Sequence, residues 1–323
     1  MCTAISLNTH GHYFGRTLDL EHRYREEIVV MPRRFPLALR RMPGGKPRHA
    51  VIGAAAVEDG FPLYYDAANE AGLAAAALNF PGFAHYVPDT GTEDGIAPFE
   101  LIPLVLSRCE NAAQARQLLR GKRIIDVPFS EKLPASPLHW LIADQKESIA
   151  VEQTASGLAV MDHPARVMTN SPPLDHQLTQ LAQHMALSPR QPQNACVPDI
   201  PLLHFGRGMG AFGLPGDWSS PSRFVRAAFL AAHSACGESE EENVRQLFHL
   251  LAAVSHPRGC VLTGDQYEIT QYTSCFSART GVYYLTTYES CEVVGVDMHR
   301  ENLNAAALIR HPIPAPAPPR MIN

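Results

Sequence analysis

Residues 1–19 read MCTAISLNTHGHYFGRTLD, and this stretch decides the fold that we expect. Two short runs of strand-forming residues, 3–7 and 12–16, flank the polar turn at 8–11 and predict a β-hairpin. If the two strands pair about that turn, Cys2 lies opposite or beside Arg16, and Asp19 follows three residues later. The hairpin therefore gathers a thiol, a guanidinium and a carboxylate at the start of the chain.

The position of Cys2 gives it a second reactive group. Methionine is readily removed before a small side chain, so we predict that Met1 is removed and that Cys2 carries a free α-amine. A thiol and an amine on one residue can act as nucleophile and general base. The amine titrates at about 7.7–8, and a guanidinium at Arg16 would favour the thiolate. A chance cysteine and an ordinary Arg16–Asp19 surface ion pair are the alternatives.

Periodicity along the rest of the chain alternates between strand and helix signals. Helices are expected from Pro98 with a kink at Pro103, from Asn111 to Gly121, over 220–232 and over 241–254. Further strands are expected at 28–31, 50–57, 72–78, 138–144, 148–153, 267–272, 281–288 and 292–296. This order predicts two sheets with helices packed outside them, in one domain over 1–323.

Two segments lack such periodicity. Residues 187–201 are rich in Pro, Gln and Asn, which predicts a long surface loop. The tail from 311 to 323 begins with a proline-rich stretch and is expected to be extended.

Composition excludes several classes of function. The formal net charge of −5 disfavours a nucleic-acid or anionic-membrane partner. No run approaches the ~18 uninterrupted apolar residues of a membrane-spanning helix, and the N-terminus lacks the basic start and apolar core of a secretory signal. Seven cysteines without a Cys-x-x-Cys pair favour a reducing cytoplasm.

No metal or organic cofactor is expected. The fifteen histidines show no His-Glu-x-x-His or comparable ligand spacing. Residues 208–213 match Gly-x-Gly-x-x-Gly, but they neither follow a strand nor open a helix, so a dinucleotide site is not predicted.

Three further residues are candidates for a site. Arg223 lies in the first turn of the helix expected from Ser220, where the helix dipole disfavours a cation; the alternative is a side chain that reaches a carboxylate elsewhere. Asn79 and Asn170 each end a strand before a Pro/Gly-rich turn. Such asparagines usually form turns, but amide hydrolysis also needs donors for a developing oxyanion.

Several separated motifs resemble the choloylglycine hydrolase family, in the order of that family and over nearly the whole chain. They are Met1-Cys2-Thr3, GRTLD at 15–19, NEAGL at 69–73, LNFPG at 78–82, MTNSP at 168–172, GLPGDWSSPSRF at 213–224, TGVYY at 280–284 and VDMH at 296–299.

The resemblance implies an α+β fold, the αββα four-layer sandwich of two antiparallel sheets of N-terminal-nucleophile (Ntn) hydrolases, and a homotetramer. Residues 187–216 would then be the arm that embraces a neighbouring subunit. Carried onto matching positions, the catalytic set would be Cys2, Arg16, Asp19, Asn79, Asn170 and Arg223. The family's oxyanion hole would come from the Asn79 backbone N–H and the Asn170 side-chain amide.

The family comprises bile salt hydrolases and penicillin V acylases, and Asn79 resembles the bile-salt branch, because the better-known penicillin branch carries Tyr there. We therefore predict cleavage of glycine- or taurine-conjugated bile acids. Penicillin V or an N-acyl homoserine lactone is the alternative substrate, and a non-catalytic binder of hydrophobic ligands is the alternative of another class. Residues that could line an apolar acyl pocket, or simply pack in the core, are Leu18, Phe61, Tyr64, Tyr65, Phe83 and Leu138.

Overall fold

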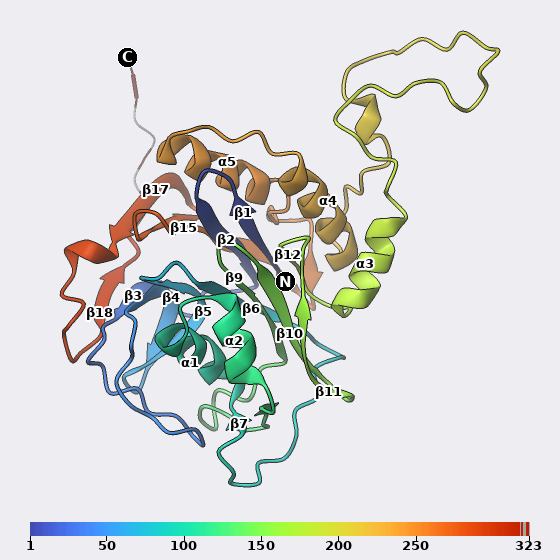
Figure 1. Cartoon of the computed structure of the whole chain (residues 1–323). Coiled ribbons are helices and arrows are strands. Elements are labelled where there is room, and N and C mark those ends of the chain that lie inside the picture. The colour runs from blue at the N-terminus through green and yellow to red at the C-terminus, as the bar shows by residue number, and fades with distance from the viewer. Residues whose placement is uncertain (317, 319–320, 323) are drawn as a thin grey trace.

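The computed structural model describes residues 1–323 except 317, 319, 320 and 323. Two large antiparallel sheets lie at its centre (Figure 1). The first has the strand order β12 (Val167–Met168), β1 (Cys2–Asn8), β2 (His12–Leu20), β15 (Ile269–Ser277), β16 (Val282–Thr287), β17 (Ser290–Asp297). The second has the order β11 (Gly157–Asp162), β10 (Ser148–Thr154), β9 (Leu138–Ala143), β6 (Ala74–Asn79), β5 (Phe61–Asn69), β4 (Val51–Glu58), β3 (Glu27–Met31), β18 (Ile309–Pro312).

Helices cover the outer face of each sheet. On the second sheet α1 (Leu101–Arg108) packs against β5 and β6, and α2 (Ala112–Leu119) packs against β9 and β10. On the first sheet α5 (Glu240–Ala252) contacts β2 and β15, while α4 (Ser220–Ala232) contacts β1 and carries α3 (Leu174–Ala182) beside it. The expected αββα sandwich is therefore confirmed.

Strand β6 explains how the inner layers pack so closely. Its residues Ala74, Ala76 and Leu78 face the core between the sheets, whereas Ala75 and Ala77 face the helices on the outside. Burial on both faces requires an unbroken apolar run, and small side chains let neighbouring layers approach. The run ends at Asn79, which is the first exposed residue of the strand.

The N-terminal hairpin forms as predicted, with β1 and β2 joined at the turn 9–11. The helix expected over 220–232 has those bounds, with Pro221 in its first turn. The prediction for residues 98–108 was partly wrong. Pro98 opens a separate 3-10 turn, Pro98–Glu100, before α1 begins at Leu101. Pro103 then falls in the first turn of α1, where its missing N–H costs no helical hydrogen bond.

The segment 187–208 contains no helix or strand, as expected for a surface loop, and extends away from the body of the molecule (Figure 1). The tail expected at 311–323 begins inside β18, where His311 pairs with Ile28 of β3. Positions 317, 319, 320 and 323 of that tail lie outside the described residues. Across the part of the chain that the structure describes, no helix has the length and apolar character needed to cross a bilayer.

Candidate active site

The hairpin places Cys2 beside Arg16, as the sequence predicted. Cys2 pairs with Leu18 and Ala4 pairs with Arg16, with one residue pair between them, so the thiol and the guanidinium stem lie on the same face of the sheet. Both are buried, with Cys2 3% and Arg16 0% exposed. The alternative of an ordinary surface ion pair is therefore excluded for Arg16.

Three backbone carbonyls hold the Arg16 guanidinium between the two sheets. Its Nε donates to the Thr17 carbonyl at 3.1 Å, and its Nη1 donates to the carbonyls of Tyr65 at 2.9 Å and Ala77 at 2.7 Å. Burial alone would lower the Arg16 pKa, but nearby anions, Cys2 foremost, raise it above its ordinary value. Arg16 is therefore a permanent cation beside the thiol.

Asp19 lies at the end of β2, beside the start of the chain. Its carboxylate accepts hydrogen bonds from the hydroxyls of Thr17 at 3.0 Å and Thr270 at 2.6 Å. Its backbone N–H donates to the Met1 carbonyl at 2.9 Å, and the Met1 amine donates to its carbonyl at 2.5 Å. The main chain of Asp19 thus fixes the residue that precedes Cys2.

Behind Asp19 lie two buried titratable residues that the sequence did not reveal. The Glu268 carboxylate is 2.8 Å from the Met1 amine and 3.0 Å from His256 Nδ1, while His256 Nε2 is 3.8 Å from the Asp19 carboxylate. Although burial would raise it, the Glu268 pKa is lowered by His256 and by the chain's amine. The nitrogen of Met1 is therefore held by the Glu268 carboxylate and the Asp19 carbonyl. Neither residue belongs to a motif, so only the folded chain reveals them.

Asn170 and Arg223 bind the backbone of Cys2. The Cys2 N–H donates to Asn170 Oδ1 at 2.8 Å. Arg223 Nη2 donates to the same oxygen at 2.8 Å, and Nη1 donates to the Cys2 carbonyl at 2.5 Å and to Thr3 Oγ1 at 2.7 Å. Arg223 is fully buried and forms no ion pair within the described ranges, which rules out the alternative of a surface carboxylate partner.

The two asparagines predicted as oxyanion donors lie side by side. Asn170 Nδ2 donates to the Asn79 carbonyl at 2.8 Å, which joins the end of β6 to the segment after β12. Ser220, the first residue of α4, accepts the Asn170 backbone N–H at 2.9 Å. The first sheet, the second sheet and α4 thus meet at one point.

A cavity of about 500 Å³ opens beside Cys2. Of the predicted pocket residues, Leu18, Tyr64, Tyr65 and Leu138 line it, together with Cys2, Arg16 and Asn79. Phe61 is not among the lining residues; instead it packs edge-on against Phe99, which does line the cavity. Phe83 stacks on Phe80 outside the lining. Lining residues that the sequence did not suggest include Leu20, Tyr24, Leu63, Phe99, Phe129 and Leu133.

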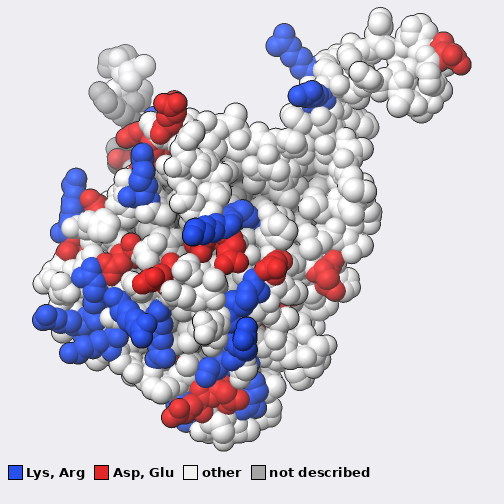
Figure 2. All heavy atoms as spheres, viewed as in Figure 1, with Lys and Arg blue, Asp and Glu red and all other residues white. Residues whose placement is uncertain are grey.

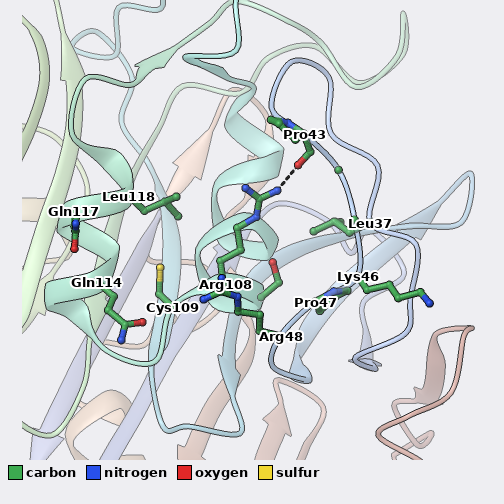
Figure 3. Close-up of a pocket in the computed structure, with 13 residues that line it drawn as sticks. Leu37, Pro43, Lys46, Pro47, Arg48, Arg108, Cys109, Gln114, Gln117 and Leu118 are labelled. Atoms are coloured by element: carbon green, nitrogen blue, oxygen red, sulfur yellow. Dashed lines mark hydrogen bonds between the residues drawn. The ribbon is translucent and has the colours of Figure 1, made fainter.

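A second hollow, of about 730 Å³, lies between α1, α2 and the loop at 43–48 (Figure 3). Arg108 points into it and donates to the Pro43 carbonyl, with Arg48 and Lys46 nearby. Cys109 also lines this hollow. Burial raises the pKa of its thiol to about 11, so this sulfur is a poor nucleophile at neutral pH. None of the predicted catalytic residues lines this hollow.

Comparisons with known proteins agree with this geometry. Residues 2–311 match the family model described as linear amide C–N hydrolases, choloylglycine hydrolase family. The chain is 41% identical to a bile salt hydrolase/transferase of Lactiplantibacillus plantarum, with both chains fully covered, and 34% identical to one of Clostridium perfringens over 94% of each.

Solved structures show the same relationship. A variant of the conjugated bile acid hydrolase from Clostridium perfringens superposes with a TM-score of 0.91, at 32% identity and full coverage of both chains. A penicillin V acylase from Agrobacterium tumefaciens has a TM-score of 0.76 over 96% of this chain and 90% of its own, but at 22% identity the likeness concerns the fold alone. With its N-terminal Cys2, its paired antiparallel sheets and these relatives, the chain belongs to the choloylglycine hydrolase family of linear amide C–N hydrolases.

Proposed function

We propose that this chain hydrolyses the amide bond between a bile acid and glycine or taurine, with the Cys2 thiolate as nucleophile. One observation carries the proposal: the backbone nitrogen of Cys2 is held by Asn170 Oδ1 at 2.8 Å, next to a buried cation and an apolar cavity. The names of the 41% and 34% identical relatives support the choice of substrate.

In the proposed reaction, each step is carried out by a group at or beside Cys2. Removal of Met1 converts the nitrogen of Cys2 into a free amine, which Asn170 Oδ1 already holds. The thiolate attacks the scissile carbonyl, and the Asn79 backbone N–H with the Asn170 amide stabilises the oxyanion. The amine protonates the departing glycine or taurine nitrogen, and an acyl thioester of Cys2 remains. Water, deprotonated by the same amine, then releases the bile acid.

The surrounding residues support this chemistry without reacting. Arg16 supplies a fixed positive charge that favours thiolate over thiol. Arg223 holds the Cys2 carbonyl and the Asn170 side chain, which keeps nucleophile and oxyanion donor in register. Asp19 gives the site a buried carboxylate at the end of the hairpin, held in place by the hydroxyls of Thr17 and Thr270.

The cavity suits a bulky hydrophobic acyl group. Most of its walls are aromatic or aliphatic, with Leu18, Tyr65 and Phe129 among them, while Glu21 and Lys132 are charged lining residues. A volume of about 500 Å³ lies within the usual range for small-molecule sites. Penicillin V and N-acyl homoserine lactones also carry an apolar acyl group on an amide, so they are the competing substrates.

Turnover of glycocholate, taurocholate and penicillin V, measured side by side with one enzyme preparation, tests the proposal. We expect at least tenfold higher kcat/KM for a conjugated bile acid than for penicillin V, and no turnover by Cys2→Ala, whose folding is checked by circular dichroism. A preference for penicillin V would assign the chain to the acylase function. Full activity of folded Cys2→Ala would exclude the mechanism. If the unmodified chain turns over none of the three amides, the non-catalytic binder of hydrophobic ligands is the alternative that remains.

We also propose that residues 187–216 form an arm through which the chain assembles with copies of itself, as a homotetramer. Leu203 and Phe205 of this segment are 87% and 85% exposed, and Ile200, Leu202 and Phe212 are exposed as well. The arm carries few charged residues in the view of Figure 2. Exposed apolar side chains on a projecting segment favour burial against a partner.

A further inference from the structure

His139 connects the two segments that carry Asn79 and Asn170. It lies in β9 and is 2% exposed. Its ring stacks on Phe80, the residue after Asn79, with ring centroids 4.2 Å apart and an interplanar angle of 9°. Its Nε2 lies 2.8 Å from the carbonyl of Thr169, the residue before Asn170. One imidazole therefore touches the immediate neighbours of both asparagines.

Each of these neighbours is fixed to the asparagine that it accompanies. Phe80 is fully buried, and its backbone N–H donates to the Pro137 carbonyl at 2.7 Å, so it cannot shift without moving the end of β6. On the other side, the Thr169 hydroxyl donates to the Ser220 carbonyl at 3.0 Å, and the same serine holds the Asn170 N–H through its hydroxyl. A displaced Thr169 carbonyl would therefore displace Asn170.

Glu152 fixes the orientation of the His139 ring. Its carboxylate, 3% exposed, lies 3.2 Å from His139 Nδ1 and accepts the backbone N–H of Leu174, the first residue of α3, at 3.1 Å. A backbone carbonyl only accepts hydrogen bonds, so Nε2 must carry a proton to bind Thr169. With Nδ1 facing the carboxylate, the ring cannot flip without losing both contacts.

We propose that His139, oriented by Glu152, is a positioning residue that sets the separation between the Asn79 and Asn170 oxyanion donors. The inference rests on the proposed function. His139 does not line the cavity beside Cys2, so it acts through Phe80 and Thr169 rather than on the substrate. Oxyanion donors act mainly in the transition state, so their misplacement lowers kcat and leaves KM nearly unchanged.

The test uses the full processed chain and two variants of the pair. His139→Phe keeps a ring to stack on Phe80 and removes both ring nitrogens; Glu152→Gln keeps the shape and removes the charge. His12→Gln is the matched control, because His12 is also 2% exposed, with its ring nitrogens 2.9 Å from Ser6 Oγ and 3.2 Å from the Gly72 carbonyl. Three quantities are measured: kcat and KM for glycocholate, and the rate at which iodoacetamide alkylates Cys2, which needs no oxyanion hole.

We expect His139→Phe to lower kcat by about 10- to 100-fold, with KM and the alkylation rate within about threefold of the unmodified chain. Glu152→Gln should lower kcat less, by about 3- to 10-fold, and it carries the test if His139→Phe does not fold. His12→Gln should stay within about threefold in all three quantities.

A kcat for folded His139→Phe within threefold of the unmodified chain would overturn the inference. So would a parallel loss of alkylation, since that would mean general damage to the site rather than a misplaced oxyanion hole. Failure of the proposed function looks different, because the unmodified chain itself would then not cleave glycocholate. In that case the same comparison is made with penicillin V, the alternative amide, and the same outcomes apply.

Discussion

Arg223 occupies a position that its own helix disfavours. A cation in the first turn of a helix opposes the helix dipole by about 0.3–1 kcal/mol, and burial lowers its pKa. Four acceptors offset this: the carbonyls of Cys2 and Trp218, Thr3 Oγ1 and Asn170 Oδ1. The local conflict seen in the sequence thus marks a residue that serves the site rather than the helix.

Replacing Arg223 by Gln leaves several of these buried acceptors without a donor. We expect the free energy of unfolding to fall by about 3 kcal/mol in urea titrations, and kcat/KM for glycocholate to fall by more than tenfold. Arg226→Gln is the matched control. Arg226 lies in the same helix and also binds backbone carbonyls, those of Ala253, Pro215 and Asp217, but it does not reach Cys2. The control should lose stability and keep kcat/KM; equal losses of activity in both variants would refute the assigned role.

Two buried histidines predict how stability depends on pH. Burial, the largest cause, lowers the pKa of His12 and of His163 to about 4 from an ordinary value near 6.5. Between these values the unfolded chain binds more protons than the folded chain, so the free energy of unfolding decreases as pH falls from about 6.5 to about 4.

Urea titrations at several pH values measure this slope. Each histidine should lower the free energy of unfolding by up to about 3 kcal/mol as the pH falls from 6.5 to 4. Above pH 6.5 this loss is absent. His12→Gln should remove the loss that His12 causes, so that the free energy of unfolding depends less steeply on pH than in the unmodified chain. An unchanged slope in the variant would contradict the assignment.

At the scale of elements, the N-terminal hairpin depends on a close approach between strands β2 and β15. A Cβ atom placed on Gly15 would lie 2.1 Å from the Ser274 carbonyl oxygen and 3.1 Å from Leu247 Cδ2. Only a residue without a side chain lets the backbone of β15 pack there. The same approach places the backbone N–H of Arg16 where it donates to Ser274 Oγ at 3.2 Å.

Gly15→Ala should therefore lower the free energy of unfolding by about 3 kcal/mol, because backbone atoms must move apart. Gly11→Ala, in the turn of the same hairpin, is the control, since its Cβ would meet Tyr13 at an ordinary 3.5 Å. Urea midpoints of both variants provide the comparison. If Gly15→Ala is as stable as Gly11→Ala, the account of this packing is wrong.

The sequence predicted those elements whose signals are local. The hairpin follows from its turn at 8–11, and α4 follows from Ser220-Pro221 at a helix start. Strand β5 was missed because Pro62 and the buried Asp66 interrupt its pattern; Asp66 is tolerated only because hydroxyls of Tyr272, Ser274 and Tyr283 from the facing sheet bind it. Helix α3 was missed because it follows Pro172-Pro173 and buries few residues.

The sequence predicted which residues make up the candidate site, but not the hydrogen bonds and ion pairs that hold them. Cys2, Arg16 and Asp19 lie on one hairpin, so their proximity follows from strand pairing. Arg223 was singled out by its place in the first turn of a helix, and Asn79 and Asn170 by their places at strand ends; the motif resemblance then assigned all three to the catalytic set. His139, Glu152, His256 and Glu268 belong to no motif. Their roles depend on contacts that form only in the folded chain, such as Glu268 with the Met1 amine and His139 with the Thr169 carbonyl.

In the whole molecule, the arm at 187–216 is the segment whose large apolar side chains the single chain leaves exposed, Leu203 and Phe205 among them. It adds exposed apolar surface to a chain whose basic and acidic side chains otherwise lie interspersed on the face seen in Figure 2. Isolated exposed apolar residues are normal, but a cluster on one projecting segment indicates a contact with another molecule.

Replacing Leu203 and Phe205 by Ser in one variant tests this contact. Sedimentation velocity should show a tetramer for the unmodified chain and smaller species for the variant, because apolar anchors dominate such interfaces. Leu262→Ser, at a residue 60% exposed outside the arm, should remain tetrameric. A tetramer that persists in the arm variant would exclude the arm as the assembly element.

The central claim concerns the first residue of the active chain. With Met1 in place, the chain's amine lies on Glu268 and Asp19, whereas the nitrogen held by Asn170 is an amide and cannot act as a base. The most direct test is the intact mass and N-terminal peptide of a preparation that cleaves glycocholate. We predict a chain that begins at Cys2 with an unblocked amine. A fully active preparation that retains Met1, or whose terminal nitrogen is blocked, would contradict the account.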